Sequence, residues 1–466
     1  YEKGGTLWLL DIATGETRKI DVRIHPDAPE TRPYIQSLAD QVQGFEISPS
    51  GERALVVARG EIFSVPTNEG ITENISRNCG ARDKDAVWSN DGEKIAYISD
   101  RSGEYEIYIR NAGGTGEAVK MTSHEDGYRH LLRWSPDDQK IAFADQTLRC
   151  YILDVGTGEI TEVDKAHYEH VDEALHHKGI YDYSWSPDSR YLAYSKMTGD
   201  LITQLFIYSL EEKKIYPVSD GLYYDFNPVF TRDGEQLLFV SNRNYSPTFC
   251  DMEWEMVYKD LAGIYSLTLK KDGNSIDFEG IQGRIEELPL PPGNYRELAV
   301  SESSLFYLNS EEGDYNKMDY RELGPRNLYR YSFDSTEAKT VMEGIDGYRL
   351  SADGSTVIYS KEGKPGMIDS NAENGTGNAL DLSEVKMEID PVREWKAIFH
   401  EAWRLERDFY YEPGMHGIDW PAMREKYGKL IDMRTCRHDV PFIIGELIGE
   451  LNTSHTYVYG GCGQRN

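Results

Sequence analysis

The sequence is dominated by a short pattern in which a polar turn is followed by a strand of alternating apolar residues. The clearest copies are Trp88-Ser-Asn-Asp-Gly92 followed by Lys94-Ile-Ala-Tyr-Ile98, and Trp134-Ser-Pro-Asp-Asp138 followed by Lys140-Ile-Ala-Phe143. In such a turn Pro presets φ, Asp bonds back to the backbone, and Gly takes the positive-φ position. The alternation that follows predicts a strand with one buried face.

Five further copies bring the total to seven, and they begin at Ile47, Trp185, Phe230, Leu298 and Leu350. Ser89, Ser135 and Ser186 lie roughly 50 residues apart, and repeats of this length with several short strands each are typical of a β-propeller. A β-sandwich with accidental similarity would not repeat one phrase seven times. We therefore predict a mainly β fold with a seven-bladed β-propeller over residues 1–382.

Two segments depart from the repeat. The chain opens with a strand-like phrase, Leu7 to Gly15, that has no turn copy in front of it. This strand either completes the last blade or belongs to a domain further upstream. An insertion over residues 242–260 interrupts the fifth blade and carries Phe249, Trp254 and Tyr258. Long loops in a compact scaffold are often functional, and a packed cap over the propeller channel is the alternative.

From Asp390 the apolar period becomes helical. Asp390 can cap a helix that has Pro391 at its first position. Further helices are predicted after Asp419 and after Thr435, the last ending at Asn452, and Tyr457-Val-Tyr459 is predicted to start a strand. The apolar face of the first helix is predicted to comprise Trp395, Ile398, Phe399, Ala402, Leu405 and Phe409. Residues 383–466 are therefore predicted to be the small α-helical start of a second domain.

Charge and cysteine usage exclude several classes of protein. The chain has 50 Lys and Arg against 80 Asp and Glu, a net charge of -30 that would repel a nucleic acid backbone. No apolar run is long enough for a membrane helix. The five cysteines are widely spaced without a CxxC motif, which argues against disulfides and a zinc ribbon and favours a cytoplasmic protein. Because the chain opens at Tyr1 rather than Met, a periplasmic location with a removed signal peptide stays open.

Few residue clusters indicate metal or nucleophile chemistry. His167, His170, His176 and His177 lie close together, but acidic residues between them favour a solvated loop, so we predict no metal and no cofactor. No GxSxG elbow occurs, which disfavours an α/β-hydrolase. A nucleophilic role for Cys462 is disfavoured, because the sequence around it matches no family signature of a catalytic cysteine.

Several longer phrases resemble a known family. They are Arg59-Gly-Glu-Ile-Phe-Ser-Val65, Pro292-Gly-Asn-Tyr-Arg296, Glu401-Ala-Trp-Arg-Leu-Glu-Arg-Asp-Phe-Tyr410, Met415-His-Gly-Ile-Asp-Trp420 and Gly445-Glu-Leu-Ile-Gly-Glu-Leu-Asn-Thr-Ser-His-Thr-Tyr457. In these the sequence is similar to the tricorn-type serine peptidases, which have a C-terminal-processing-peptidase type core. The resemblance implies that residues 1–382 are the family's seven-bladed propeller and residues 383–466 the incomplete helical N-terminal part of its peptidase core.

The resemblance also implies a site, a substrate and an assembly. Ser454 and His455 match the family's catalytic Ser-His dipeptide, with His455 as general base and Ser454 orienting its imidazole. The nucleophilic serine and a carboxylate are expected in a second core domain, so the chain alone is predicted to be inactive. Unfolded peptides are the expected substrate, and the parent enzyme is expected to be a homo-oligomer. The alternative is a non-catalytic TolB-like propeller that docks peptides or proteins.

The net charge bears on the propeller channel. An acidic chain predicts either a channel mouth lined partly by carboxylates, which would attract basic peptides, or a neutral channel with acidity spread over the surface.

Overall fold

The computed structural model describes residues 1–3, 6–22, 27–114, 116–123, 127–168, 170–171, 177–180, 182–200, 202–250, 254–271, 275–311 and 325–459. The chain divides into two compact units, each formed from separate stretches. The β unit comprises residues 38–76 and 83–385, and the helical unit comprises residues 1–37, 77–82 and 386–466. The chain passes from the β unit to the helical unit for the last time between residues 385 and 386, and the first 37 residues belong to the helical unit.

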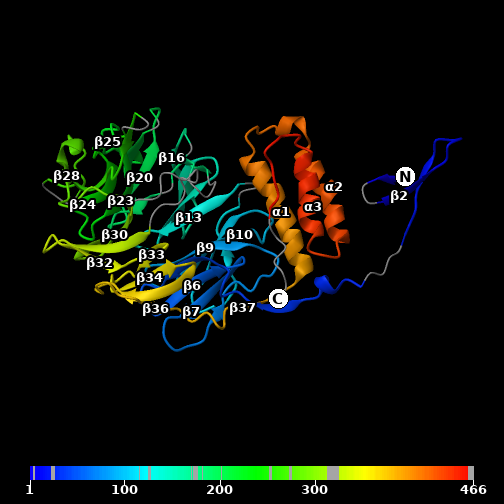
Figure 1. Ribbon diagram of the computed structural model, residues 1–466, viewed down its shortest axis with the longest axis horizontal. Helices are drawn as coiled ribbons and strands as arrows, with labels where there is room; N and C mark the ends of the chain where they lie inside the picture. Colours follow the sequence, from blue (N-terminus) through cyan, green and yellow to red (C-terminus); the bar gives the residue numbers. More distant parts are fainter. Residues whose placement is uncertain are drawn as a thin grey trace. The chain divides into compact units, whose positions relative to one another are not determined.

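Within the described residues, the β unit contains seven four-stranded antiparallel sheets, each made from consecutive stretches of chain (Figure 1). The first three are β5 (Val42–Ile47), β6 (Arg53–Ala58), β7 (Glu61–Pro66) and β8 (Glu73–Asn74); β9 (Asp83–Trp88), β10 (Lys94–Ser99), β11 (Glu106–Asn111) and β12 (Val119–Lys120); and β13 (Arg129–Trp134), β14 (Lys140–Asp145), β15 (Arg149–Asp154) and β16 (Ile160–Lys165).

The other four sheets follow in chain order. They are β19 (Ser184–Trp185), β20 (Tyr191–Met197), β21 (Thr203–Ser209) and β22 (Lys214–Pro217); β23 (Tyr224–Phe230), β24 (Gln236–Asn242), β27 (Ala262–Thr268) and β28 (Ile285–Glu287); β29 (Tyr295–Val300), β30 (Ser304–Ser310), β31 (Arg326–Ser332) and β32 (Ala338–Met342); and β33 (Gly347–Leu350), β34 (Thr356–Lys361), β35 (Lys364–Asp369) and β36 (Asn378–Ala379).

The predicted insertion is a hairpin of its own. Strands β25 (Pro247–Cys250) and β26 (Glu255–Tyr258) pair with each other between β24 and β27. Trp254 at its tip is 81% exposed. A second short pair, β17 (His170–Val171) and β18 (His177–Lys178), precedes β19.

The predicted turns form as their residues dictate. At the β9–β10 turn, the Ser89 hydroxyl donates to Asp91 Oδ1 at 2.6 Å and accepts the backbone N–H of Lys94 at 2.9 Å. Asp91 Oδ1 also accepts the backbone N–H of Glu93 at 2.9 Å. The same hydroxyl-to-aspartate bond recurs four more times, at Ser135, Ser186, Thr231 and Ser351. In each of these turns the polar side chains form hydrogen bonds within the turn itself, and these bonds stabilise the hairpin between the first two strands.

First strands of neighbouring sheets follow one another around a ring. β5 contacts β9, β9 contacts β13, β19 contacts β23, β23 contacts β29, β29 contacts β33, and β33 contacts β5. Between β13 and β19, Trp185 Nε1 donates to the carbonyl of Arg133 at 3.1 Å. This is the arrangement of a β-propeller, with the first strand of every sheet innermost.

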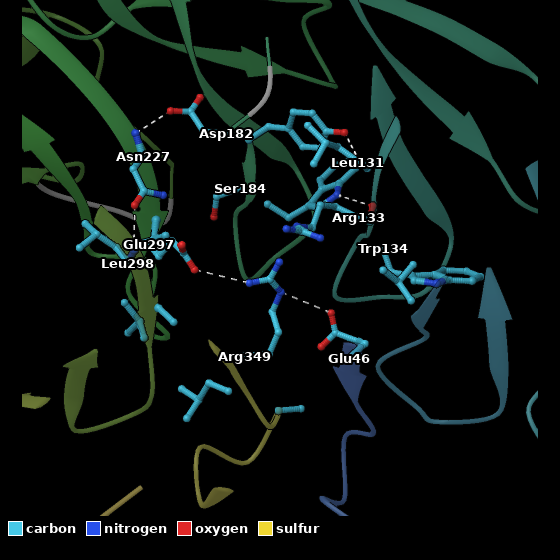
Figure 2. Close-up of a pocket in the computed structure, with 18 of the residues that line it drawn as sticks. Glu46, Leu131, Arg133, Trp134, Asp182, Ser184, Asn227, Glu297, Leu298 and Arg349 are labelled. Atoms are coloured by element: carbon cyan, nitrogen blue, oxygen red, sulfur yellow. Dashed lines mark hydrogen bonds and ion pairs between the residues drawn. The ribbon is translucent and has the colours of Figure 1, made fainter. Parts of the chain in front are cut away.

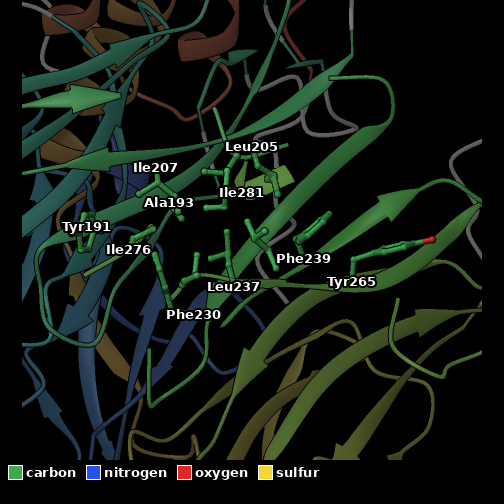
Figure 3. Packing of buried hydrophobic residues seen from close by; sticks show 13 residues of the cluster. Tyr191, Ala193, Leu205, Ile207, Phe230, Leu237, Phe239, Tyr265, Ile276 and Ile281 are labelled. Atoms are coloured by element: carbon green, nitrogen blue, oxygen red, sulfur yellow. The ribbon is translucent and has the colours of Figure 1, made fainter. Parts of the chain in front are cut away.

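The β unit is held together mainly by apolar side chains between adjacent sheets. One such cluster lies between the sheet of β19–β22 and the sheet of β23, β24, β27 and β28 (Figure 3). Phe239, Leu205 and Leu237 in it are completely buried. A buried side chain of this size contributes about 2 kcal/mol, so the interface between sheets supplies much of the stability.

The helical unit carries two further sheets besides its helices. β1 (Glu2–Lys3), β2 (Thr6–Leu10) and β3 (Thr17–Lys19) form a small sheet, and β4 (Tyr34–Ser37) pairs with β37 (Lys386–Ile389). The opening strand β2 therefore pairs with β1 and β3 and does not complete the sheet of β33–β36. Short 3-10 helices lie at η1 (Pro29–Thr31) and η3 (Met415–Gly417), and a third, η2 (Ile281–Arg284), belongs to the β unit.

The three α-helices begin largely where their caps predict. α1 (Pro391–Phe409) has Asp390 as N-cap, whose side chain accepts the N–H groups of Val392 and Arg393. α2 (Trp420–Met433) is capped by Asp419, and α3 (Asp439–Gly449) begins four residues after Thr435 and ends before the predicted Asn452.

Two details of the helical prediction are wrong. Leu405 is exposed, and Trp403 is buried instead, because its indole N–H reaches the carbonyl of Trp420 at 2.9 Å. The predicted strand at Tyr457–Tyr459 is irregular backbone, and no strand of the described chain pairs with it. A strand needs such a partner to satisfy its backbone groups.

Candidate functional site

Ser454 and His455 lie on an irregular segment that follows α3. Both residues are exposed. The backbone reverses there through two positive φ angles, 52° at Asn452 and 63° at His455. Non-glycine residues adopt this conformation rarely, and such residues cluster at functional sites. The segment thus presents the imidazole of His455 outward.

Hydrogen bonds around Thr453 hold this segment. The Tyr410 hydroxyl, at the end of α1, forms a hydrogen bond with Thr453 Oγ1. Thr453 Oγ1 also donates to the carbonyl of Leu451 at 3.1 Å, and Thr456 Oγ1 donates to the carbonyl of Thr453 at 3.1 Å. Helix α1 therefore fixes the base of the segment one residue before Ser454.

The imidazole of His455 meets few groups. Its ring lies edge-on to Tyr457, with 6.4 Å between ring centroids and an angle of 87°. Within the described residues it makes no hydrogen bond, and the Ser454 hydroxyl is not bonded to it. The structure thus places the two predicted residues on one turn without joining their side chains. A neutral imidazole in this position can accept a proton once a second group fixes its tautomer.

A second candidate site is a cavity of about 790 Å³ at the centre of the β unit. It is lined by the first strand of every four-stranded sheet (Figure 2). Representative lining residues are Glu46 of β5, Trp88 of β9, Arg133 of β13, Trp185 of β19, Asn227 of β23, Glu297 of β29 and Arg349 of β33. A site built from all seven sheets depends on the whole ring.

Bulges shape the wall of this cavity. Positive φ angles occur at Asp85, Leu131, Asn227 and Glu297, between 51° and 61°. The pairing register shifts at each of these places in β9, β13, β23 and β29. At a bulge, two residues of one strand lie opposite a single residue of its partner, and the side chains change direction. The alternation of inward and outward side chains, which sequence patterns use to identify strands, is therefore interrupted in these four strands.

Side chains at the bulges link neighbouring sheets. Asp182 Oδ2 accepts the backbone N–H of Asn227 at 2.6 Å, and Asn227 Oδ1 accepts that of Leu298 at 2.7 Å (Figure 2). Burial raises the pKa of Asp182 to about 6, although bonds from Ser195 and Asn227 oppose this. The inner rim is therefore fastened by side chains as well as by apolar packing.

The described lining carries both signs of charge. It includes four arginines and three carboxylates, the latter being Glu46, Asp182 and Glu297. The net charge of the chain, -30, is thus not concentrated at the cavity. Sequence reasoning did not single out these residues, because an arginine in a strand resembles any solvent-facing residue.

Other residues considered from the sequence fall partly outside the structure. His176 and Cys462 lie outside the described residues, as do the side chains of His170 and His177. No helix within the described residues has the length and apolar character needed to cross a membrane.

Two family models match the chain. The model described as the tricorn protease second beta propeller domain matches residues 42–276, and that described as the tricorn protease C1 domain matches residues 391–449. The second match ends five residues before Ser454.

Relatives match over nearly the whole chain. "Tricorn protease homolog 1" of Streptomyces coelicolor is 24% identical, over 98% of this chain and 46% of its own length. "Tricorn protease" of Thermoplasma volcanium is 23% identical, over 99% of this chain and 45% of its own length. The crystal structure of the tricorn protease superposes with a TM-score of 0.81 at 20% identity, over 97% of this chain and 45% of that one, and shows the same fold. The chain spans about half the length of the relatives it matches.

Proposed function

The chain belongs to the tricorn protease family, and from this we propose that it is the propeller and first core segment of a serine peptidase that degrades peptides. One observation carries the proposal. An exposed Ser-His pair follows the segment that matches the C1 domain by five residues, and residues 42–276 of the same chain match the family's propeller. A propeller that only docks partners has no need of this pair.

In the proposed mechanism His455 is the general base. A nucleophilic serine, from the part of the relatives' length that this chain does not span, attacks the peptide carbonyl while the His455 imidazole takes its proton. The imidazole then gives this proton to the leaving amine as the peptide C–N bond breaks, and it next takes a proton from the water that hydrolyses the resulting acyl-enzyme. Ser454 links the imidazole to a carboxylate outside these residues and so fixes its tautomer.

The β unit has a separate role in the proposal. We infer that its seven sheets are the blades of one closed propeller and that the central cavity admits unfolded peptide. The contacts from β33 back to β5 and the lining of the cavity by every sheet support this. The parent enzyme is proposed to be a homo-oligomer in the cytoplasm.

The test uses the complete enzyme with the sequence beyond residue 466 included. His455→Ala should lower kcat/KM for an unfolded peptide at least about 1000-fold, since it removes the general base. His416→Ala is the matched control, because His416 is a histidine of the same unit whose imidazole bonds to Tyr411 instead.

Ser454→Ala should reduce the rate less, and it should move the pH–rate profile because His455 loses its orienting group. If His455→Ala hydrolyses peptides like the wild type, the peptidase proposal fails. In that case a propeller that docks peptides without cleaving them becomes the better account.

A further inference from the structure

Two arginines reach into the central cavity from different sheets. Arg133 comes from β13 and Arg349 from β33, and both guanidinium groups point toward the middle of the cavity (Figure 2). Neither of these residues is explained by the turn pattern or by the Ser-His pair.

Arg349 is positioned by two long ion pairs and one hydrogen bond, which involve only some of its N–H groups. Its Nε lies 3.8 Å from Glu46 Oε2 and its Nη1 lies 3.8 Å from Glu297 Oε2. These are distances of ion pairs, too long for hydrogen bonds. Its hydrogen bond runs from Nη1 to the carbonyl of Tyr348, at 2.7 Å. The side chain is 44% exposed, and its guanidinium lies in the cavity (Figure 2).

Arg133 is less well compensated. Its Nη1 donates to the carbonyl of its neighbour Leu132 at 3.1 Å, and within the described residues no carboxylate forms an ion pair with it. Burial lowers the pKa of Arg133 and the positive charge of Arg349 lowers it further, while Glu46, Tyr183 and Asp85 oppose the shift in part. A guanidinium nevertheless stays protonated in proteins, so two like charges face the same cavity.

We propose that Arg133 and Arg349 together form a binding site for a carboxylate group of a peptide inside the propeller cavity. The inference rests on the proposed function, which brings peptides into this cavity. Each guanidinium presents N–H groups in a planar fork that matches two carboxylate oxygens. A bound carboxylate also offsets the repulsion between the two cations.

The ligand class follows from the surroundings. The chain's charge of -30 repels polyanions such as nucleic acids, whereas a single carboxylate on an otherwise uncharged peptide meets little of this repulsion. Glu46 and Glu297 flank Arg349, so a basic peptide could pair with them only in competition with that arginine. The carboxylate can be the C-terminus of the peptide or an Asp or Glu side chain, since the chemistry is the same.

The test measures peptide binding by the full 466-residue chain with fluorescence anisotropy at low salt. Three labelled unfolded peptides share one uncharged sequence: the first ends in an amide, the second in a free carboxylate, and the third ends in an amide but contains one central Glu. We expect the second or the third to bind about tenfold more tightly than the first, as for a charge-assisted hydrogen bond. Whichever binds more tightly identifies the source of the carboxylate.

Variants locate the effect. Arg133→Gln and Arg349→Gln should each remove most of the tenfold preference, and Arg133→Lys should retain part of it because charge remains while the fork is lost. Lys213→Gln is the charge-matched control, since Lys213 is exposed on the turn between β21 and β22. Equal unfolding midpoints in urea show that the variants are folded.

Two results would overturn the inference. If the wild type binds all three peptides equally, or if the double Arg133→Gln, Arg349→Gln variant keeps the preference, the arginines do not form this site, while the peptidase proposal stands. If none of the three peptides binds, both the carboxylate site and the entry of peptides into the cavity are contradicted.

Discussion

A buried triad of aspartate, serine and arginine recurs in the β unit. Asp225 on β23 is fully buried, and its Oδ1 accepts a hydrogen bond from Arg243 Nη2 at 3.2 Å. The Nε of the same arginine donates to the Ser241 hydroxyl at 2.7 Å. The sheet of β9–β12 repeats this arrangement with Asp83, Ser99 and Arg101. In both, the aspartate is near the start of the first strand and the Ser-x-Arg phrase ends the second. The triad thus links the first two strands at the end of the hairpin opposite the turn.

Replacement of Asp225 by Asn should therefore destabilise the protein strongly. The change leaves Arg243 without its buried counter-charge, and breaking one partner of a buried pair costs about 3 kcal/mol. Burial raises the pKa of Asp225, while the bond from Ser241 and the charge of Arg243 oppose this; because the buried carboxylate is itself costly, its removal offsets part of the loss. Urea denaturation of the full chain gives the free energy of unfolding.

Asp200→Asn is the control for this measurement, because Asp200 is exposed. It should change the free energy of unfolding by less than about 0.5 kcal/mol. A loss at Asp225 no larger than that at Asp200 would show that the triad contributes nothing to stability.

At the scale of elements, the helical unit is organised by two tryptophans. Trp403 Nε1 on α1 donates to the carbonyl of Trp420 at 2.9 Å, and Trp420 Nε1 on α2 donates to the carbonyl of Trp403 at 3.0 Å. Both side chains are at least 95% buried. This reciprocal pair ties the first turn of α2 to α1 and explains why Trp403 rather than Leu405 faces the core.

Trp403→Phe and Trp420→Phe should each lower the free energy of unfolding by about 1–3 kcal/mol, because each removes a buried hydrogen bond between the two helices and part of a buried aromatic ring. The double variant should lose less than the sum if the two bonds support one another. A thermal or urea transition reported by far-UV circular dichroism checks this. Strict additivity would contradict mutual support, and no loss in either single variant would contradict the role of the bonds.

The elements differ in how far sequence could predict them. The first hairpin of five sheets was foreseeable because Ser-x-Asp or Thr-x-Asp turns form hydrogen bonds within themselves, and α1 and α2 were foreseeable because Asp390 and Asp419 cap them. Three of the fourth strands, β8, β12 and β36, are only two residues long and carry no periodicity. The cavity arginines depend on seven strands meeting at one centre and on bulges that break alternation, which no local pattern records.

At the scale of the whole molecule, the proposed chemistry divides between this chain and residues outside it. His455, the proposed base, is exposed, and the described residues provide no hydroxyl bonded to it. A base without a positioned nucleophile has nothing to activate. The β unit, in contrast, forms its cavity entirely from residues of this chain.

The 466-residue chain by itself should therefore show no peptide hydrolysis above background. Release of new amino groups from an unfolded peptide is the measurement, with the complete enzyme as positive control. Hydrolysis by the isolated chain that disappears in His455→Ala would mean that a nucleophile within these residues had been overlooked.

The interleaved composition of the helical unit has a consequence for synthesis. Its stretches are residues 1–37, 77–82 and 386–466, and Glu30 accepts the backbone N–H of Arg437 at 2.9 Å, while β4 pairs with β37. On the ribosome, residues 1–37 emerge before all of residues 38–385 and meet their partners only once residues 386–466 have followed. The β unit can thus complete its sheets first, and the nascent chain keeps β4 as an unpaired edge strand until β37 leaves the exit tunnel.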